Sequence, residues 1–365
     1  MNKKFKNEKR LLILLSRITF SQADMEEINE IVKEKISWCE LFKYALRNKV
    51  VTLVWYNIQK LNIRHVPKYN KQILSYALAG QTKQNKVFME EKNRILNILS
   101  ENGVIAVPVK GAMLVDLLYK SYGIRTLGDL DFLIKKQDEK IVDKCMKKIG
   151  YQKGTYDAES NTVIPVDRRE DIKWKIGATN FHPYIKVVES GFMNFVKIDF
   201  RHSLDESLDN KPINNIIQYY EENGKVNPTH IILHLAVHMY YEATHSMSLL
   251  YNKDINLIKF CDIREYCLES MDDLNFDEIV QLAEEYNVKN SVYYTFYYLK
   301  QIYNDGYEEK VLGQLREMNI DDVDRCYNSD KKEFYAWKKD FSDRMFASDN
   351  FDELDDIKYE MNKSF

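Results

Sequence analysis

The sequence predicts an α+β protein that is predominantly helical, with a small mixed sheet in the middle of the chain. Only 12 glycines and 6 prolines occur among 365 residues, so turns are scarce and helices are favoured. Apolar residues recur at helical spacing up to about residue 102 and again beyond residue 227, and short apolar runs typical of strands lie between. We therefore expect a helical module at 1–102, an α/β core at 103–226, and a second helical module with an acidic tail at 227–365.

The first module is expected to be helical throughout. Its apolar side chains recur every three to four residues, as in Trp38, Leu41 and Phe42. The last helix of the module is predicted from about residue 70 to residue 99, because Asn102-Gly103 provides a suitable C-terminal stop.

Strands and helices are expected to alternate in the core. Strands are predicted at 104–109, 130–134 and 195–200, and helices at 112–120 and 138–149. The apolar runs at 184–188 and 195–200 flank Ser190-Gly191 and predict a hairpin, whereas residues 151–189 otherwise show little pattern. From Asn227-Pro228 onward the chain returns to helices, and its last sixty residues are expected to form peripheral helices.

Charge and cysteine usage limit the classes of function. A formal charge of −3 gives no strong signal for nucleic acid, and no apolar stretch is long enough to cross a membrane. The five cysteines are scattered without a C-x-x-C spacing, which is typical of reduced thiols in a cytoplasmic protein. The sequence leaves the oligomeric state open.

Acidic residues within apolar strands are the main candidates for a functional site. Asp129 and Asp131 lie two residues apart on a predicted strand, so their side chains point to the same side. Asp199 lies in another apolar strand, where burial without a partner would be costly, and that strand is expected beside the first. Three carboxylates of this kind are suited to holding Mg²⁺ or Mn²⁺.

Cationic residues precede the first two carboxylates. Lys110-Gly111 is predicted at a strand-to-helix turn, and Arg125 lies four residues before Asp129. Lys and Arg there would suit the phosphates of a nucleoside triphosphate. An isolated Asp-x-Asp is more often a pair of strand-edge residues, but the combination with Asp199 and these cations favours a site.

The run K-G-A-x-L, followed by Y-G-x-R, D-L-D-F-L-I and a later I-D-F, resembles the nucleotidyltransferase superfamily that includes DNA polymerase β. More narrowly, the chain is similar to an uncharacterised bacterial nucleotidyltransferase family over roughly its first three hundred residues. The resemblance implies that Asp129, Asp131 and Asp199 bind Mg²⁺ and that Asp199 helps to deprotonate the acceptor.

The same resemblance implies a phosphate site formed by Lys110, Gly111, Ala112 and Arg125. Gly111 would let the backbone approach the phosphates, and Lys110 and Arg125 would neutralise developing charge. Two features depart from the superfamily pattern: the turn is Gly-Ala rather than Gly-Gly or Gly-Ser, and Arg201-His202 stands where a His two residues after the third carboxylate is common.

A stripe of histidines follows in the second helical module. His230, His234, His238 and His245 would share one face of a continuous helix. We favour the interpretation that this face packs across the core with its ring nitrogens hydrogen-bonded. A zinc site is the alternative, and an intermediate possibility is that His234, His238 and Tyr241 line the nucleotide cleft.

The resemblance implies transfer of a nucleoside monophosphate, AMP in the favoured case, from an NTP to a hydroxyl or phosphate of a small molecule, sugar or peptide, with release of pyrophosphate. Two alternatives stay open. One is a catalytically silent module that binds a nucleotide or a partner, motivated by the Gly111-Ala112 turn; the other is a toxin-like enzyme that modifies tRNA or protein.

Overall fold

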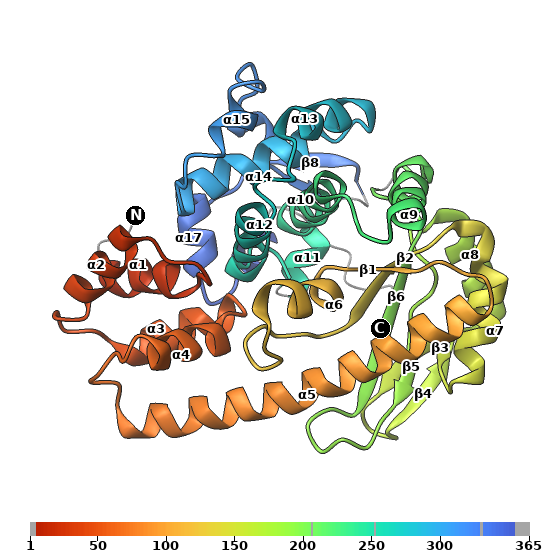
Figure 1. Ribbon diagram of the computed structural model, residues 1–365, viewed down its shortest axis with the longest axis horizontal. Coiled ribbons are helices and arrows are strands. Elements are labelled where there is room, and N and C mark those ends of the chain that lie inside the picture. The colour runs from red at the N-terminus through yellow and green to blue at the C-terminus, as the bar shows by residue number, and fades with distance from the viewer. Residues whose placement is uncertain (1–4, 206, 252, 329–330, 355–365) are drawn as a thin grey trace. The chain divides into compact units, whose positions relative to one another are not determined.

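The computed structural model describes residues 5–205, 207–251, 253–328 and 331–354 (Figure 1). It is 57% helical with a small mixed sheet, which confirms the predicted fold class. None of the helices in these ranges is both long enough and apolar enough to span a membrane. Residues 355–365, the end of the predicted acidic tail, lie outside the described residues.

The chain forms two compact units. One combines residues 1–72 with 235–365 and is called the helical unit below; the other, residues 73–234, is called the sheet unit. The boundaries between the two units fall within the helices α5 (Lys68–Glu101) and α10 (Pro228–Thr244). The expected boundaries at residues 102 and 226 remain a prediction.

The helical unit contains short helices and one pair of strands. Its elements besides α10 are α1 (Lys6–Leu15), α2 (Gln22–Ile31), α3 (Trp38–Arg47), α4 (Val51–Lys60), α11 (Ser246–Leu250), α12 (Leu257–Glu269), α13 (Phe276–Glu285), α14 (Lys289–Ile302), α15 (Glu309–Leu312), α16 (Ile320–Val323), β7 (Cys326–Asn328), β8 (Glu333–Tyr335), α17 (Phe341–Phe346) and the 3₁₀ turn Phe351–Leu354. The antiparallel pair β7–β8 corrects the expectation that this region is purely helical.

The sheet unit carries the six-stranded sheet, in the order β1-β2-β6-β5-β3-β4. Its elements besides α5 are β1 (Val107–Val109), α6 (Gly111–Leu114), the π-helical turn Val115–Tyr119, β2 (Leu130–Leu133), the 3₁₀ turn Lys136–Asp138, α7 (Glu139–Lys148), β3 (Gln152–Asp157), β4 (Thr162–Pro165), α8 (Arg168–Gly177), β5 (Tyr184–Val187), β6 (Phe195–Arg201) and α9 (Lys211–Asn223). Only β2 and β6 run parallel, and the other neighbours are antiparallel.

Several predicted elements are confirmed, with shifted ends. The hairpin of β5 and β6 forms as expected. The first strand is shorter than predicted, and the helix expected at 112–120 is a short α-helix that continues as a π-helical turn. Residues 151–189 also hold β3, β4 and α8, which the sequence did not indicate.

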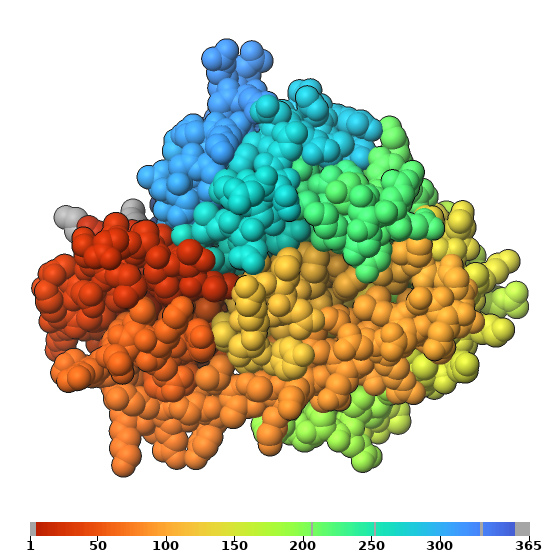
Figure 2. Space-filling view, in the orientation of Figure 1, coloured from red at the N-terminus to blue at the C-terminus, as the bar shows by residue number. Residues whose placement is uncertain are grey.

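The second half of α5 packs on one face of the sheet because it is amphipathic. Phe88, Ile95 and Leu99 are buried in an apolar cluster with strand residues such as Phe132 and Phe200. Figure 1 shows α5 crossing the sheet, and its opposite face forms an orange band on the surface in Figure 2. Because side chains alternate along a strand, the residues between these apolar ones face the other side of the sheet.

Candidate functional site

The parallel pair β2 and β6 brings two of the predicted carboxylates together. Asp131 and Asp199 are direct partners in the register, and they are only 5% and 8% exposed. Their strand neighbours Leu130, Phe132 and Ile198 belong to the apolar cluster on the opposite face. The alternation that buries those apolar side chains therefore places both carboxylates on the face away from the cluster.

Asp129 directly precedes β2, one position before the first paired residue of that strand. Burial and the negative charges of Asp131 and Asp199 raise the pKa of its carboxyl group. Since 39% of the Asp129 side chain stays exposed, the like charges contribute more to this rise in pKa than burial does. The three predicted acids thus act on one another electrostatically.

Lys110 follows the end of β1 and reaches one of these acids. Its Nζ lies 2.7 Å from Oδ1 of Asp131, and β1 pairs with β2 so that Val109 faces Asp131. The Lys110 backbone has φ 50° and ψ −132°, a combination that a residue with a Cβ rarely adopts. Such a conformation costs about 1–3 kcal/mol and tends to occur at functional sites.

Gly111 is required by close packing rather than by its own backbone conformation. A Cβ at this position would lie 2.3 Å from Nη1 of Arg125 and 2.3 Å from Cδ2 of Leu127. The predicted Lys-Gly turn and the predicted Arg are therefore packed directly together. The Ala112 side chain is buried in the apolar cluster.

The segment that carries Arg125 is fixed by α5. Asn85, which is fully buried, donates hydrogen bonds to the carbonyl oxygens of Tyr122 and Arg125, the latter at 2.7 Å. Gln81 donates to the Asn85 side-chain oxygen at 2.7 Å and so fixes the orientation of the amide. These contacts define where Arg125 lies against Gly111.

Two cations that the prediction did not include complete the arrangement. Lys197 Nζ lies 2.7 Å from Asp199 and 3.7 Å from Asp129. Although burial opposes its charge, Asp199 and Asp129 raise the pKa of Lys197. Arg201 Nε lies 4.0 Å from Asp131.

A period of two along β6 was the signal that could have identified these cations. Residues 197, 199 and 201 share one face of the strand, so Lys197 and Arg201 flank Asp199. His202 belongs to the other side: its Nδ1 lies 3.1 Å from Asn210 Oδ1, and its ring packs near Phe181. Arg201, not His202, therefore shares the face of the third carboxylate.

The histidine stripe does not form one continuous surface. Helix α10 ends at Thr244, so the prediction that His245 shares this helix was wrong; His245 is instead the N-cap residue before α11. His238 pairs with Glu242 at 3.4 Å. His238 and Tyr241 belong to the helical unit, and their predicted place along a cleft stays a prediction.

His234 is the one residue of the predicted cleft lining that belongs to the sheet unit. It is 2% exposed, and neither ring nitrogen has a hydrogen-bond partner among the described residues. Burial, with the nearby charges of Lys110 and Arg201, lowers its pKa to about 3. A neutral imidazole thus lies within the electrostatic reach of the Lys110–Asp131 pair, and the expected hydrogen bonding of this ring is not seen.

The donor chemistry at the paired strands suits one divalent cation. Mg²⁺ and Mn²⁺ prefer oxygen ligands, which Asp131 and Asp199 supply. Asp199 Oδ1 is buried and has no hydrogen-bond partner within the described ranges, which is costly unless something else binds it. As the described side chains stand, however, no three Asp, Glu, His or Cys residues converge closely enough to hold an ion.

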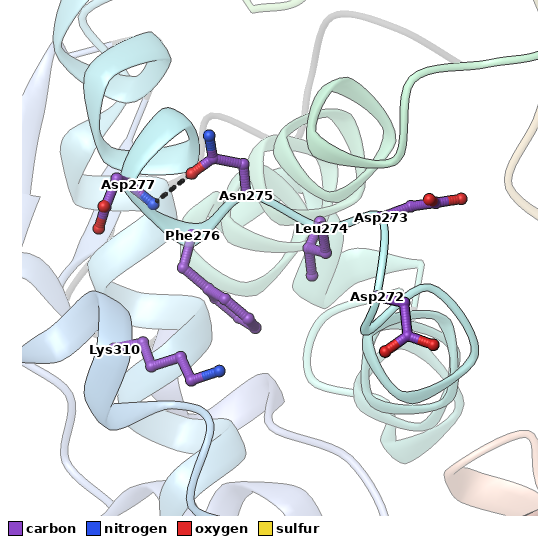
Figure 3. Close-up of a pocket in the computed structure, with 7 residues that line it drawn as sticks. All are labelled: Asp272, Asp273, Leu274, Asn275, Phe276, Asp277 and Lys310. Atoms are coloured by element: carbon purple, nitrogen blue, oxygen red, sulfur yellow. Dashed lines mark hydrogen bonds between the residues drawn. The ribbon is translucent and has the colours of Figure 1, made fainter.

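A shallow pocket in the helical unit contains none of the predicted site residues. It lies at the start of α13 and is lined by residues 272–277 and Lys310 (Figure 3). Asn275 caps the helix there by accepting a hydrogen bond from the Asp277 backbone amide at 3.1 Å. Asn275 therefore has a structural role at the start of α13, and the pocket shares no residue with the carboxylates of the sheet unit.

Comparison with known families agrees with the geometry of the sheet unit. The model of an uncharacterised nucleotidyltransferase family matches residues 34–304. The chain belongs to this family, and the membership supports nucleotidyl transfer as its general activity. No curated protein and no solved structure matches the chain.

Proposed function

We propose that the chain is a divalent-metal-dependent nucleotidyltransferase that uses the carboxylates of β2 and β6. It would move a nucleoside monophosphate, AMP in the favoured case, from an NTP to a hydroxyl or phosphate of a small molecule, sugar or peptide. The acceptor oxygen forms a bond to the α-phosphorus, the bond to the β-phosphate oxygen breaks, and pyrophosphate leaves. The observation that carries this proposal is the pairing of Asp131 with Asp199 across parallel strands.

Asp131 and Asp199 would hold the ion, with Asp129 at the edge of the same face. A bound Mg²⁺ supplies neutralisation of the triphosphate charge and makes the acceptor hydroxyl more acidic. The Asp199 carboxylate would also accept the acceptor proton. Its position on a central strand, rather than on a loop, keeps this carboxylate in place.

The cations on the β1 side would bind the phosphates. Lys110 is already within 2.7 Å of Asp131, so binding of a triphosphate lets its ammonium group move from the carboxylate to a phosphate oxygen. Arg125, fixed over Gly111, would bind the departing pyrophosphate. Neutral His234 would add a hydrogen bond near the same charges without adding charge of its own.

Pyrophosphate release with each of the four NTPs, Mg²⁺ and a panel of acceptors tests the proposal. The Asp131→Asn variant keeps the shape of the side chain but loses its charge, and we expect its rate to be at least about 100-fold lower than that of the wild type. Asp143→Asn is the matched control, because Asp143 lies on α7 and pairs with the exposed Lys147. Full activity in Asp131→Asn, or equal loss in both variants, would contradict the proposal.

A catalytically silent nucleotide-binding module is the second candidate. It is favoured by the pairing of each carboxylate with a cation of the same chain, through Lys110, Lys197 and Arg201. Calorimetric titration with NTP and Mg²⁺ separates the two. Tight binding without turnover on any acceptor would favour this second candidate over the first.

A further inference from the structure

Lys197 occupies a place between two of the proposed metal-binding carboxylates. Its ammonium nitrogen lies 2.7 Å from Asp199 Oδ2 and 3.7 Å from Asp129 Oδ2. A positive group that contacts two carboxylates at once does electrostatically what a second metal ion does in a two-metal site. The contact is built into the sheet, since Lys197 and Asp199 share one face of β6.

Each carboxylate of the cluster already pairs with a cationic side chain. Three carboxylates, Asp129, Asp131 and Asp199, face three cationic side chains, Lys110, Lys197 and Arg201. Lys110 can turn to a triphosphate, as proposed above, which leaves one net negative charge near Asp131. That charge suits one divalent ion, while a second ion would have to lie beside the Lys197 ammonium group and be repelled by it.

The free oxygen of the cluster is also in the right place for a single ion. Asp199 uses Oδ2 to bind Lys197, and its buried Oδ1 has no hydrogen-bond partner among the described residues. The unused oxygen belongs to the residue that pairs with Asp131 across the strands. One ion can therefore bind without displacing Lys197. Within the described ranges, the three carboxylates do not converge closely enough to hold metal ions together.

We propose that Lys197 serves as a permanent second cation, so that the site binds one divalent ion where a three-carboxylate site would otherwise bind two. This inference rests on the proposed function, because it assumes that Asp131 and Asp199 bind metal. Lys197 is a positioning residue in this scheme: its charge keeps a second ion away from Asp129 and Asp199, and it contacts no substrate.

The number of bound Mn²⁺ ions tests this directly. Free Mn²⁺ is measured by electron paramagnetic resonance in a titration of the full chain with one equivalent of a non-hydrolysable ATP analogue. We expect one ion per wild-type chain. Lys197→Met, which keeps the length of the side chain but removes its charge, should bind two, and Lys197→Arg should return to one.

Lys186→Met is the matched control. Lys186 lies on the neighbouring strand β5, with a side chain 18% exposed that pairs with Glu91 at 2.7 Å, so the variant also removes an ammonium partner from a partly buried carboxylate. It should bind one ion, as the wild type does. The wild-type count needs no variant, so the test remains decisive if Lys197→Met fails to fold.

Three results have distinct meanings. Two ions in the wild type would overturn the inference while leaving the proposed function intact. One ion in a folded Lys197→Met variant would also overturn it and would reduce Lys197 to a structural ion pair. No bound ion in any variant would instead refute the metal-dependent function on which the inference rests.

Discussion

Replacement of Gly111 by alanine tests the packing on which the site depends. The added Cβ would lie 2.3 Å from both Arg125 Nη1 and Leu127 Cδ2, which is about 1.1 Å short of the 3.4 Å at which ordinary contact begins. The tip of Arg125 can turn away, but Leu127 is 3% exposed and has little room. Overpacking of a filled interior usually costs about 1–3 kcal/mol, and we expect Gly111→Ala to lose an amount in that range.

Gly128→Ala is the control for this experiment. Gly128 lies just before Asp129 and its backbone is not left-handed; apart from its chain neighbours, no described residue has an atom within 4 Å of where an added Cβ would lie. Alanine there should be neutral or should stabilise by about 0.4–1 kcal/mol, because it restricts the unfolded chain.

Both variants are compared by urea unfolding followed by circular dichroism, and by calorimetric binding of the non-hydrolysable ATP analogue. Gly111→Ala should unfold at lower urea and bind the analogue more weakly, since Arg125 must leave its position. If Gly111→Ala matched Gly128→Ala in both measurements, the argument that Gly111 exists to admit Arg125 would be refuted.

Three further predictions concern the same unit. Lys110→Gly and Lys110→Met both lose the ion pair to Asp131, but only glycine removes the backbone strain, so the glycine variant should be the more stable by about 1 kcal/mol in urea unfolding; equal stability would exclude the strain. Because the folded-state pKa of His234 is about 3, below its unfolded value of about 6.5, the unfolded chain takes up this proton first, and stability should fall as pH falls from about 6.5 towards 3. His234→Gln should flatten that part of the pH profile of the unfolding midpoint, and an unchanged slope would refute the assignment. Asn85→Ala should lose about 1–3 kcal/mol, because two loop carbonyls lose their buried donor, and hydrogen exchange should rise in residues 122–126 rather than throughout the unit.

The strands that carry the carboxylates were predictable because they combine buried apolar residues with isolated charges. Leu130, Phe132 and Ile198 alternate with Asp131 and Asp199, and this period of two indicates both the strand and its two faces. The sequence predicted that these two strands lie beside each other, but it predicted neither their parallel direction nor their register.

The elements that were missed bury few side chains. Strand β4 has no buried residue, β3 buries only Gly154, and α8 buries none, so none of them leaves a periodic apolar signal. Lys197 was missed for a different reason. Its charge was visible, but its importance depends on a contact with Asp129, which directly precedes β2, and such a contact is known only once β2 and β6 are paired.

The anchoring of the Arg125 segment by α5 limits how the length of this chain can vary among related proteins. Asn85 and the buried Phe88 lie within one turn of the same helix, and each residue of a helix turns by about 100°. A single insertion or deletion between them would rotate Asn85 away from the loop carbonyls while Phe88 stayed in the core. The exposed turn at residues 158–161, between β3 and β4, carries no such constraint, so we expect natural length changes to accumulate there and to be absent between residues 85 and 88.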